Sequence, residues 1–133
     1  MFEVFCYGTL KRGGRFEHLL VKAGGVYERD AMTVAAYWLS TSDRASFPCL
    51  TGPPAGKRGV AILGEVWECD GDCLRELDRI EGVSRGLFAR GQVELSDGGL
   101  AIAYFYAADG GQPMEVNCGD SWPPALAPEK KKA

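Results

Sequence analysis

Two strand-forming segments, residues 87–95 and 100–107, flank the tetrapeptide SDGG at Ser96–Gly99. Asp-Gly between two strand patterns is a strong signal for a tight β-hairpin turn. Val93 and Leu95 alternate with polar neighbours, which is typical of a strand with one buried face. The sequence therefore predicts an antiparallel hairpin in the second half of the chain.

The rest of the chain adds strand patterns and two short helices. Further strands are predicted over residues 2–7, 32–39 and 60–68, and helices over residues 15–23 and 70–80. Gly64 indicates a bend or bulge inside its strand. The connections are too short for a regular βαβ succession. We therefore expect an α+β domain built on a strongly curved or barrel-like, mostly antiparallel sheet.

Length and composition limit the function classes. A chain of 133 residues with 46% apolar content fits one globular domain. The net charge of −3 argues against a nucleic-acid partner, which usually meets a clustered basic face. No apolar run is long enough to span a membrane, and the start does not resemble a signal peptide, so a cytoplasmic protein is predicted. The domain is assigned to residues 1–122, and residues 123–133 to a disordered basic tail.

The five cysteines suggest neither a disulfide framework nor a metal site. An odd number fits disulfides poorly, and a reducing compartment keeps thiols free. Cys69 and Cys73 lack a second Cys/His pair, and His18 is the only histidine, whereas zinc needs about four ligands. We expect small core side chains and no bound metal.

The predicted helix GDCLRELDRIEG carries an acidic residue on its apolar side. At about 100° per residue, Leu74, Leu77 and Ile80 form one stripe, and Glu81 falls on it. A carboxylate directed toward the core has a raised pKa and can exchange a proton near neutral pH. Alternatively, Glu81 lies past the last turn, turns out to water, or pairs with Arg85 or Arg90.

The first strand ends in an unusual tetrapeptide, Tyr7, Gly8, Thr9 and Leu10. Gly8 has no Cβ, so the loop can turn and present its main-chain N–H groups without obstruction. Such donors can bind a carboxylate or a developing oxyanion. An ordinary glycine turn explains the same four residues if they are taken alone.

Several segments in order resemble the gamma-glutamylcyclotransferase-like superfamily, and most closely its small gamma-glutamylamine cyclotransferase branch. They are VFCYGTLKRG, FPCL, GEVWECDGDCLRELDRIEGV, LFARGQVEL and AIAYFYA, with CGDSW as a weaker match. The resemblance runs from Val4 to about Ala107. Its specificity comes from the order and spacing of YGTLxxG and LDxxEG.

The resemblance implies a small mixed, mostly antiparallel β-barrel with a few short helices and a pocket at its mouth. It implies that Tyr7, Gly8, Thr9 and Leu10 hold a gamma-glutamyl group and that Glu81 is the catalytic glutamate. It also implies a small-molecule gamma-glutamyl substrate and no metal or organic cofactor. The leaving amine and the oligomeric state stay open, and residues 40–59 are expected to select the amine.

Three positions modify this expectation. Phe88 stands where relatives have a tyrosine, so a hydroxyl is missing. Tyr106 matches a tyrosine of the relatives. Its side chain either lines the pocket or packs in the core of the barrel. His18 lies where relatives carry Asn-His after the loop, and bracing of that loop is the expected role.

The expected reaction is attack of the substrate's α-amino group on its side-chain carbonyl, which releases 5-oxoproline and an amine. Glu81 first takes a proton and later returns it. Two alternatives remain. One is a non-catalytic domain that binds a gamma-glutamyl or amino-acid ligand on the same fold. The other is a protein-interaction domain that uses the tail.

Overall fold

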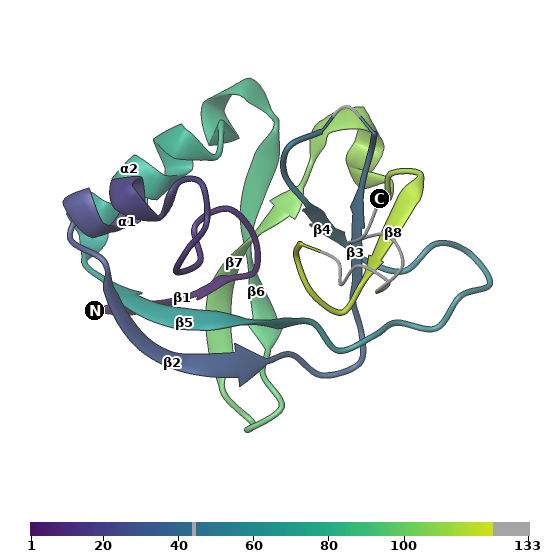
Figure 1. Ribbon diagram of the computed structural model, residues 1–133, viewed down its shortest axis with the longest axis horizontal. Coiled ribbons are helices and arrows are strands. Elements are labelled where there is room, and N and C mark those ends of the chain that lie inside the picture. The colour runs from purple at the N-terminus through teal and green to yellow at the C-terminus, as the bar shows by residue number, and fades with distance from the viewer. Residues whose placement is uncertain (44, 124–133) are drawn as a thin grey trace, which may run out of the picture.

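The structure, a computed structural model, describes residues 1–43 and 45–123. The predicted hairpin is present as β6 (Phe88–Glu94) and β7 (Leu100–Tyr106). The two strands pair antiparallel along their whole length, from Phe88 opposite Tyr106 to Glu94 opposite Leu100. This hairpin forms one side of the larger of two sheets (Figure 1).

The larger sheet has five strands in the order β2-β5-β1-β7-β6. It is completed by β1 (Phe2–Cys6), β2 (Val26–Met32) and β5 (Leu63–Cys69). Only β1 and β7 pair in parallel; the other neighbours are antiparallel. The predicted α+β class with a mixed, mostly antiparallel sheet is confirmed.

The sheet is not a closed barrel, whereas the resemblance implied a closed or nearly closed one. Its edge strands β2 and β6 meet only just beyond their ends, where Thr33 forms an isolated bridge with Leu95. Two further main-chain bonds join this corner, from Val34 N to Glu94 O at 3.0 Å and from Ser96 N to Met32 O at 2.8 Å. Barrel closure needs edge strands that pair along their length, and these two strands do not.

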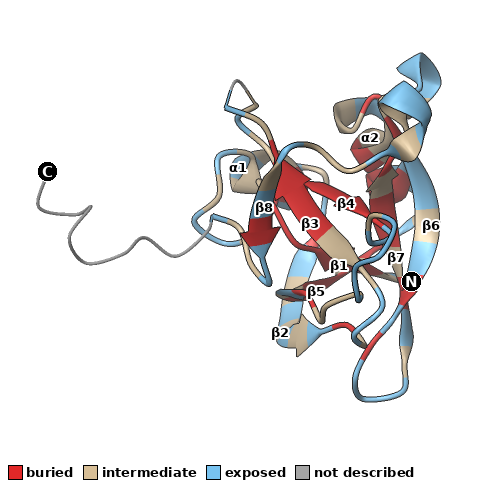
Figure 2. Cartoon of the chain, turned by 90° about the vertical axis from the view of Figure 1, so that its right-hand side faces the viewer, coloured by how far each residue is buried: buried red, intermediate tan, exposed pale blue. Residues whose placement is uncertain are grey.

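The smaller sheet has three strands in the order β4-β3-β8. They are β3 (Trp38–Thr41), β4 (Cys49–Thr51) and β8 (Val116–Gly119). Figure 2 shows β3 and β4 mostly buried. Leu39 and Leu50 of this sheet pack in one apolar cluster with Phe5, Val66 and Val93 of the larger sheet. The core therefore continues between the two sheets.

Two α-helices lie on the same side of the larger sheet, α1 (Glu17–Lys22) and α2 (Gly71–Ile80) (Figure 1). The N-cap of α2 is Asp70, whose side chain accepts a hydrogen bond from Cys73 N at 2.8 Å. Gly82, with φ of 67°, ends the helix as predicted. Short 3₁₀ turns follow at η1 (Val83–Arg85) and η2 (Ala108–Gly111).

Several predicted boundaries are wrong. Residues 32–39 form no single strand, because β2 ends at Met32 and β3 begins at Trp38. Most of β2 was missed because its side chains alternate only between exposed and half-buried positions and leave no apolar face. Of the bend or bulge predicted at Gly64, the bulge is not observed, because the register shift of the β2–β5 ladder lies between Tyr27 and Arg29. A Cβ at Gly64 would lie 2.6 Å from the Phe5 ring, so the glycine permits close packing.

All five cysteines lie buried as free thiols. Within residues 1–43 and 45–123, no group of three or more His, Cys, Asp or Glu side chains is arranged to hold a metal ion. The same part of the chain has no helix both long and apolar enough to cross a bilayer. The predicted basic tail lies outside the described residues, apart from Pro123.

Candidate active site

A cavity of about 180 Å³ opens between the loop after β1 and the end of α2. Segments far apart in the sequence contribute to it, and all the site residues proposed from the sequence are among them. Its lining residues are Val4, Phe5, Cys6, Tyr7, Gly8, Thr9, Leu10, Phe16, Phe47, Pro48, Ile80, Glu81, Leu87, Phe88 and Tyr104. The wall is mainly apolar, and Glu81 carries its one carboxylate.

The loop after β1 is tightly folded. Lys11 N donates to Gly8 O at 3.1 Å, and Phe16 N donates to Thr9 O at 2.8 Å. A Cβ on Gly8 would lie 2.8 Å from Pro48 Cγ, so this position needs glycine for lack of space rather than for a special backbone angle. The main chain of the loop therefore lies directly against residues of the 40–59 segment.

Three amides of this loop have no hydrogen-bond partner in the part of the chain that the structure describes. No acceptor within residues 1–43 and 45–123 takes a hydrogen bond from the N–H groups of Gly8, Thr9 or Leu10. Buried or half-buried main-chain donors normally have a partner. A run of unpaired N–H groups beside a cavity can accept a carboxylate or an oxyanion.

The side chain of Tyr7 fixes the start of the loop to the sheet. Its hydroxyl donates to Tyr104 O of β7 at 2.6 Å. Burial, with a smaller contribution from the nearby Glu81 charge, raises the pKa of Tyr7 well above its usual value. Tyr7 therefore remains a neutral hydrogen-bond donor at physiological pH.

Glu81 is the residue immediately after α2, and its amide still donates to Leu77 O at 2.8 Å. Its side chain is half-buried and lines the cavity. Burial raises the pKa of Glu81 to about 7. None of the ion pairs formed by the described residues includes Glu81, so the alternative of a partner at Arg85 or Arg90 is not observed.

Arg90 instead holds the neighbouring Asp78, which fixes α2 to the β6–β7 hairpin. Arg90 Nε donates to Asp78 Oδ1 at 2.9 Å, and the Tyr104 hydroxyl donates to the same oxygen at 2.7 Å. Hydrogen bonds from Arg90 and Tyr104 hold the pKa of Asp78 below its usual value. These contacts lie one turn before Glu81 and limit the movement of the helix end.

The three modifying positions have distinct environments. Phe88 lines the cavity and packs edge-to-face against Phe47 and Tyr106. Tyr106 is not a lining residue, and its hydroxyl donates to Asp109 Oδ2 at 2.9 Å, so packing is its observed role. His18 is exposed on α1.

Sequence reasoning missed much of the cavity wall. Phe47 and Pro48 belong to the apolar island FPCL, which indicated a buried segment but not its position. Phe16 and Leu87 gave no separate signal, because a single apolar residue beside a helix or strand is ordinary core material.

Comparison with known proteins places the chain in a family. Residues 4–123 match the family described as Gamma-glutamyl cyclotransferase, AIG2-like. The chain belongs to this family. The resemblance inferred from the YGTLxxG and LDxxEG motifs is therefore confirmed.

Individual relatives agree with this membership. The chain is 33% identical over 85 residues to a gamma-glutamylaminecyclotransferase from Rattus norvegicus; the match covers 62% of this chain. It spans only 56% of that relative's length. The crystal structure of an AIG2-like protein from Mus musculus superposes with a TM-score of 0.71 at 24% identity, covering 98% of this chain and 92% of the mouse chain.

The cyclotransferase-family fold also occurs within a much larger protein. Kluyveromyces lactis allophanate hydrolase matches with a TM-score of 0.71 at 19% identity. The match covers 92% of this chain but 20% of the hydrolase. At this identity the likeness concerns the fold alone.

Proposed function

We propose that this family member is a gamma-glutamyl cyclotransferase acting on a gamma-glutamyl amine or amino acid. One observation carries the proposal: Glu81, whose pKa is raised to about 7, and the unpaired amides of Gly8–Leu10 belong to one cavity. The name of the 33% identical rat relative agrees with this chemistry.

The reaction begins at the α-ammonium group of the substrate. Glu81 takes one proton from it, and the neutral nitrogen attacks the side-chain carbonyl carbon. The new C–N bond closes a five-membered ring, and the carbonyl oxygen carries the charge. When the bond to the attached amine breaks, Glu81 returns its proton to that nitrogen. The ring nitrogen then gives up its second proton through Glu81 to the departing amine, which leaves as an ammonium ion. The products are 5-oxoproline and the free amine, with no net oxidation or reduction.

Glu81 suits both proton transfers because burial brings its pKa close to neutrality. A carboxylate with a pKa near 4.5 is a weak base at pH 7, whereas one near 7 accepts and donates a proton with similar ease. The loop amides of Gly8, Thr9 and Leu10 supply donors for the substrate carboxylate or for the developing oxyanion.

The site needs few groups because the attack is intramolecular. Holding two reacting groups of one substrate in the right geometry contributes roughly 7–11 kcal/mol at best. A narrow, mainly apolar cavity with one proton-transfer group and a row of donors meets this need.

A substrate panel tests the proposal. The purified protein is incubated with gamma-glutamyl amines, gamma-glutamyl dipeptides and glutathione, and 5-oxoproline is measured by mass spectrometry. We expect 5-oxoproline from at least one class. Ligand binding measured by calorimetry without any product would contradict the proposal and favour a non-catalytic binding domain.

A further inference from the structure

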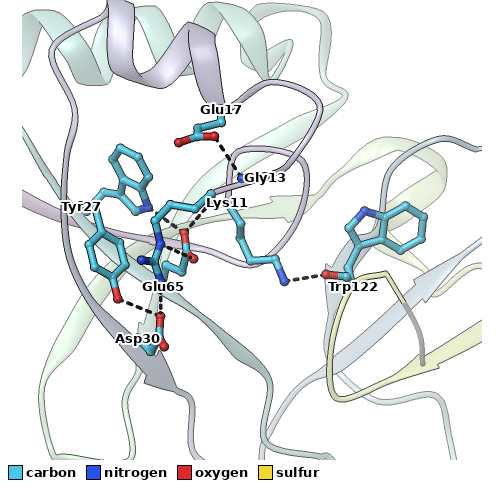
Figure 3. A network of polar contacts seen from close by, with 9 residues as sticks. Lys11, Gly13, Glu17, Tyr27, Asp30, Glu65 and Trp122 are labelled. Carbon is cyan, nitrogen blue, oxygen red and sulfur yellow. Dashed lines mark hydrogen bonds and ion pairs between the residues drawn. The ribbon is translucent and has the colours of Figure 1, made fainter. Parts of the chain in front are cut away.

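Glu65 occupies an unusual place on β5, between β1 and β2. It is the main-chain partner of Cys6 on one side and Asp30 on the other. Its side chain is only 10% exposed and accepts hydrogen bonds from Arg12 N at 2.9 Å, Arg12 Nε at 3.0 Å and Trp67 Nε1 at 3.1 Å (Figure 3). A buried carboxylate with three N–H donors is held in one orientation.

The loop that carries the free amides is closed at both ends by this one residue. Cys6, just before the loop, lies opposite Glu65 in the β1–β5 ladder. Arg12, just after it, donates its main-chain N–H to the Glu65 carboxylate. The unpaired amides of Gly8–Leu10 lie between these two points. Glu65 therefore sets where those amides lie relative to the sheet.

The surrounding contacts are more exposed. The Arg12 guanidinium also pairs with Asp30 at 3.0 Å and lies 3.6 Å above the Tyr27 ring. The side chains of Arg12 and Asp30 are 47% and 76% exposed, and exposed ion pairs contribute little. The bond from Arg12 N to Glu65 is the better protected anchor. Asp30 therefore offers a matched control on the same guanidinium.

We propose that Glu65 is a positioning residue for the reaction: through Arg12 it holds the Gly8–Leu10 amides at the places where they receive the substrate's glutamyl oxygens. The inference rests on the proposed function. Glu65 itself does not line the cavity, so it acts through the loop. A shift of about 1 Å in a positioning group can reduce the rate about 100-fold.

The test compares three variants of the full chain. Glu65→Ala removes the anchor, and we expect kcat/KM for 5-oxoproline formation to fall about 10- to 100-fold. Glu65→Gln keeps one acceptor oxygen and should recover part of this loss. Asp30→Asn should stay within about twofold of the wild type, because Asp30 touches no loop amide.

The pH profile distinguishes positioning from proton transfer. The midpoint of the acid limb of kcat/KM should remain near that of the wild type in Glu65→Gln, because Glu81 is unchanged. A displaced midpoint would assign Glu65 a proton-transfer role and overturn the inference. Equal kcat/KM for Glu65→Ala and the wild type would overturn it as well, while leaving the cyclotransferase proposal intact.

Hydrogen exchange gives a second measurement that needs no substrate. In Glu65→Ala, exchange at the Arg12 amide, followed by NMR, should accelerate at least about tenfold, whereas the β6–β7 hairpin should keep its wild-type rates. An unchanged exchange rate at the Arg12 amide would contradict the proposal that Glu65 anchors the loop through Arg12. A wild-type protein that forms no 5-oxoproline would instead overturn the proposed function, whatever the exchange data show.

Discussion

Glu81 lines the cavity and Glu65 does not, and the surroundings of the two glutamates differ. Glu65 receives three N–H hydrogen bonds. Glu81, at the end of α2, lines the cavity, and no donor of the described residues bonds to its carboxylate. Burial without donors disfavours the charged form and raises the pKa of Glu81 to about 7. The molecule thus contains one carboxylate held by three N–H donors and one, the proposed proton-transfer group, with no donor among the described residues.

Two walls of the cavity are also stabilised by different contacts. The helix wall is the end of α2 at Ile80 and Glu81, and the loop wall is the segment Tyr7–Leu10. The helix wall is placed by apolar packing of Leu74 and Leu77 and by the Asp78–Arg90 pair. The loop wall is placed by polar contacts to a strand 53 residues away. Apolar packing thus supports the wall that carries Glu81, whereas polar contacts support the wall that carries the Gly8–Leu10 amides.

The largest expected effect is on turnover in Glu81→Gln. The substituted amide has nearly the same size as the carboxylate but can neither accept nor return a proton, so kcat should fall about 10²- to 10⁴-fold. The measurement is the rate of 5-oxoproline formation from the best substrate of the panel. Glu76→Gln is the matched control, because Glu76 lies on the outward side of α2 with its side chain 41% exposed. Equal turnover in Glu81→Gln and the wild type would remove Glu81 from the mechanism.

A smaller effect is expected at Gly8, where the loop wall meets Pro48. The added methyl group of Gly8→Ala would lie 2.8 Å from Pro48 Cγ, so the loop must shift. We expect a loss of about 1–3 kcal/mol in the free energy of unfolding and a fall in kcat/KM of about 10-fold or more. Denaturant titration and the product assay measure the two effects.

Gly52→Ala serves as the control for this substitution. A Cβ at Gly52 meets no atom within 4 Å, and the position is exposed. Gly52→Ala should therefore change neither the free energy of unfolding nor kcat/KM appreciably. If Gly8→Ala behaved like Gly52→Ala, the loop would be far more adaptable than its contacts indicate, and the contrast between the two walls would weaken.

The helix wall was more predictable than the loop wall, for a physical reason. Its position follows from local periodicity: apolar residues at helical spacing bury one face of α2, and Glu81 continues that face. The Asp70 cap and Gly82 stop are likewise local signals. Long, strongly periodic segments are the most reliable part of a sequence-based prediction.

The contacts of the loop wall could not be predicted in the same way. The sequence indicated bare amides at Tyr7–Leu10, but the anchor from Arg12 to Glu65 joins residues far apart in the chain. The only signal was the presence of two glutamates, Glu65 and Glu68, inside the otherwise apolar strand LGEVWEC, and it does not indicate which of them is buried. Strand β8 was missed because its pairing with β3 is set by tertiary packing rather than by an apolar alternation of its own.

The last prediction concerns stability and its dependence on pH. Because folding raises the pKa of Glu81 from 4.5 to about 7, the folded state holds this proton more tightly than the unfolded chain does. The stabilisation by the protonated form is complete below about pH 4.5 and is lost as the pH rises toward 7. Glu81→Gln has no charge to bury, so it should be more stable than the wild type above pH 7, by about 1–3 kcal/mol for a half-buried group. The difference should vanish near pH 4.5.

Urea titrations at several pH values between about 4.5 and 8 measure this difference. Glu76→Gln should show no such gain, because hydrogen bonding to Arg79 lowers the pKa of Glu76 and gives its linkage the opposite sign. The difference in the free energy of unfolding between Glu81→Gln and the wild type should depend on pH. If it stayed constant over this pH range, Glu81 would have the same pKa in the folded and the unfolded chain. Glu81 and Glu65 would then no longer represent two different uses of a buried carboxylate.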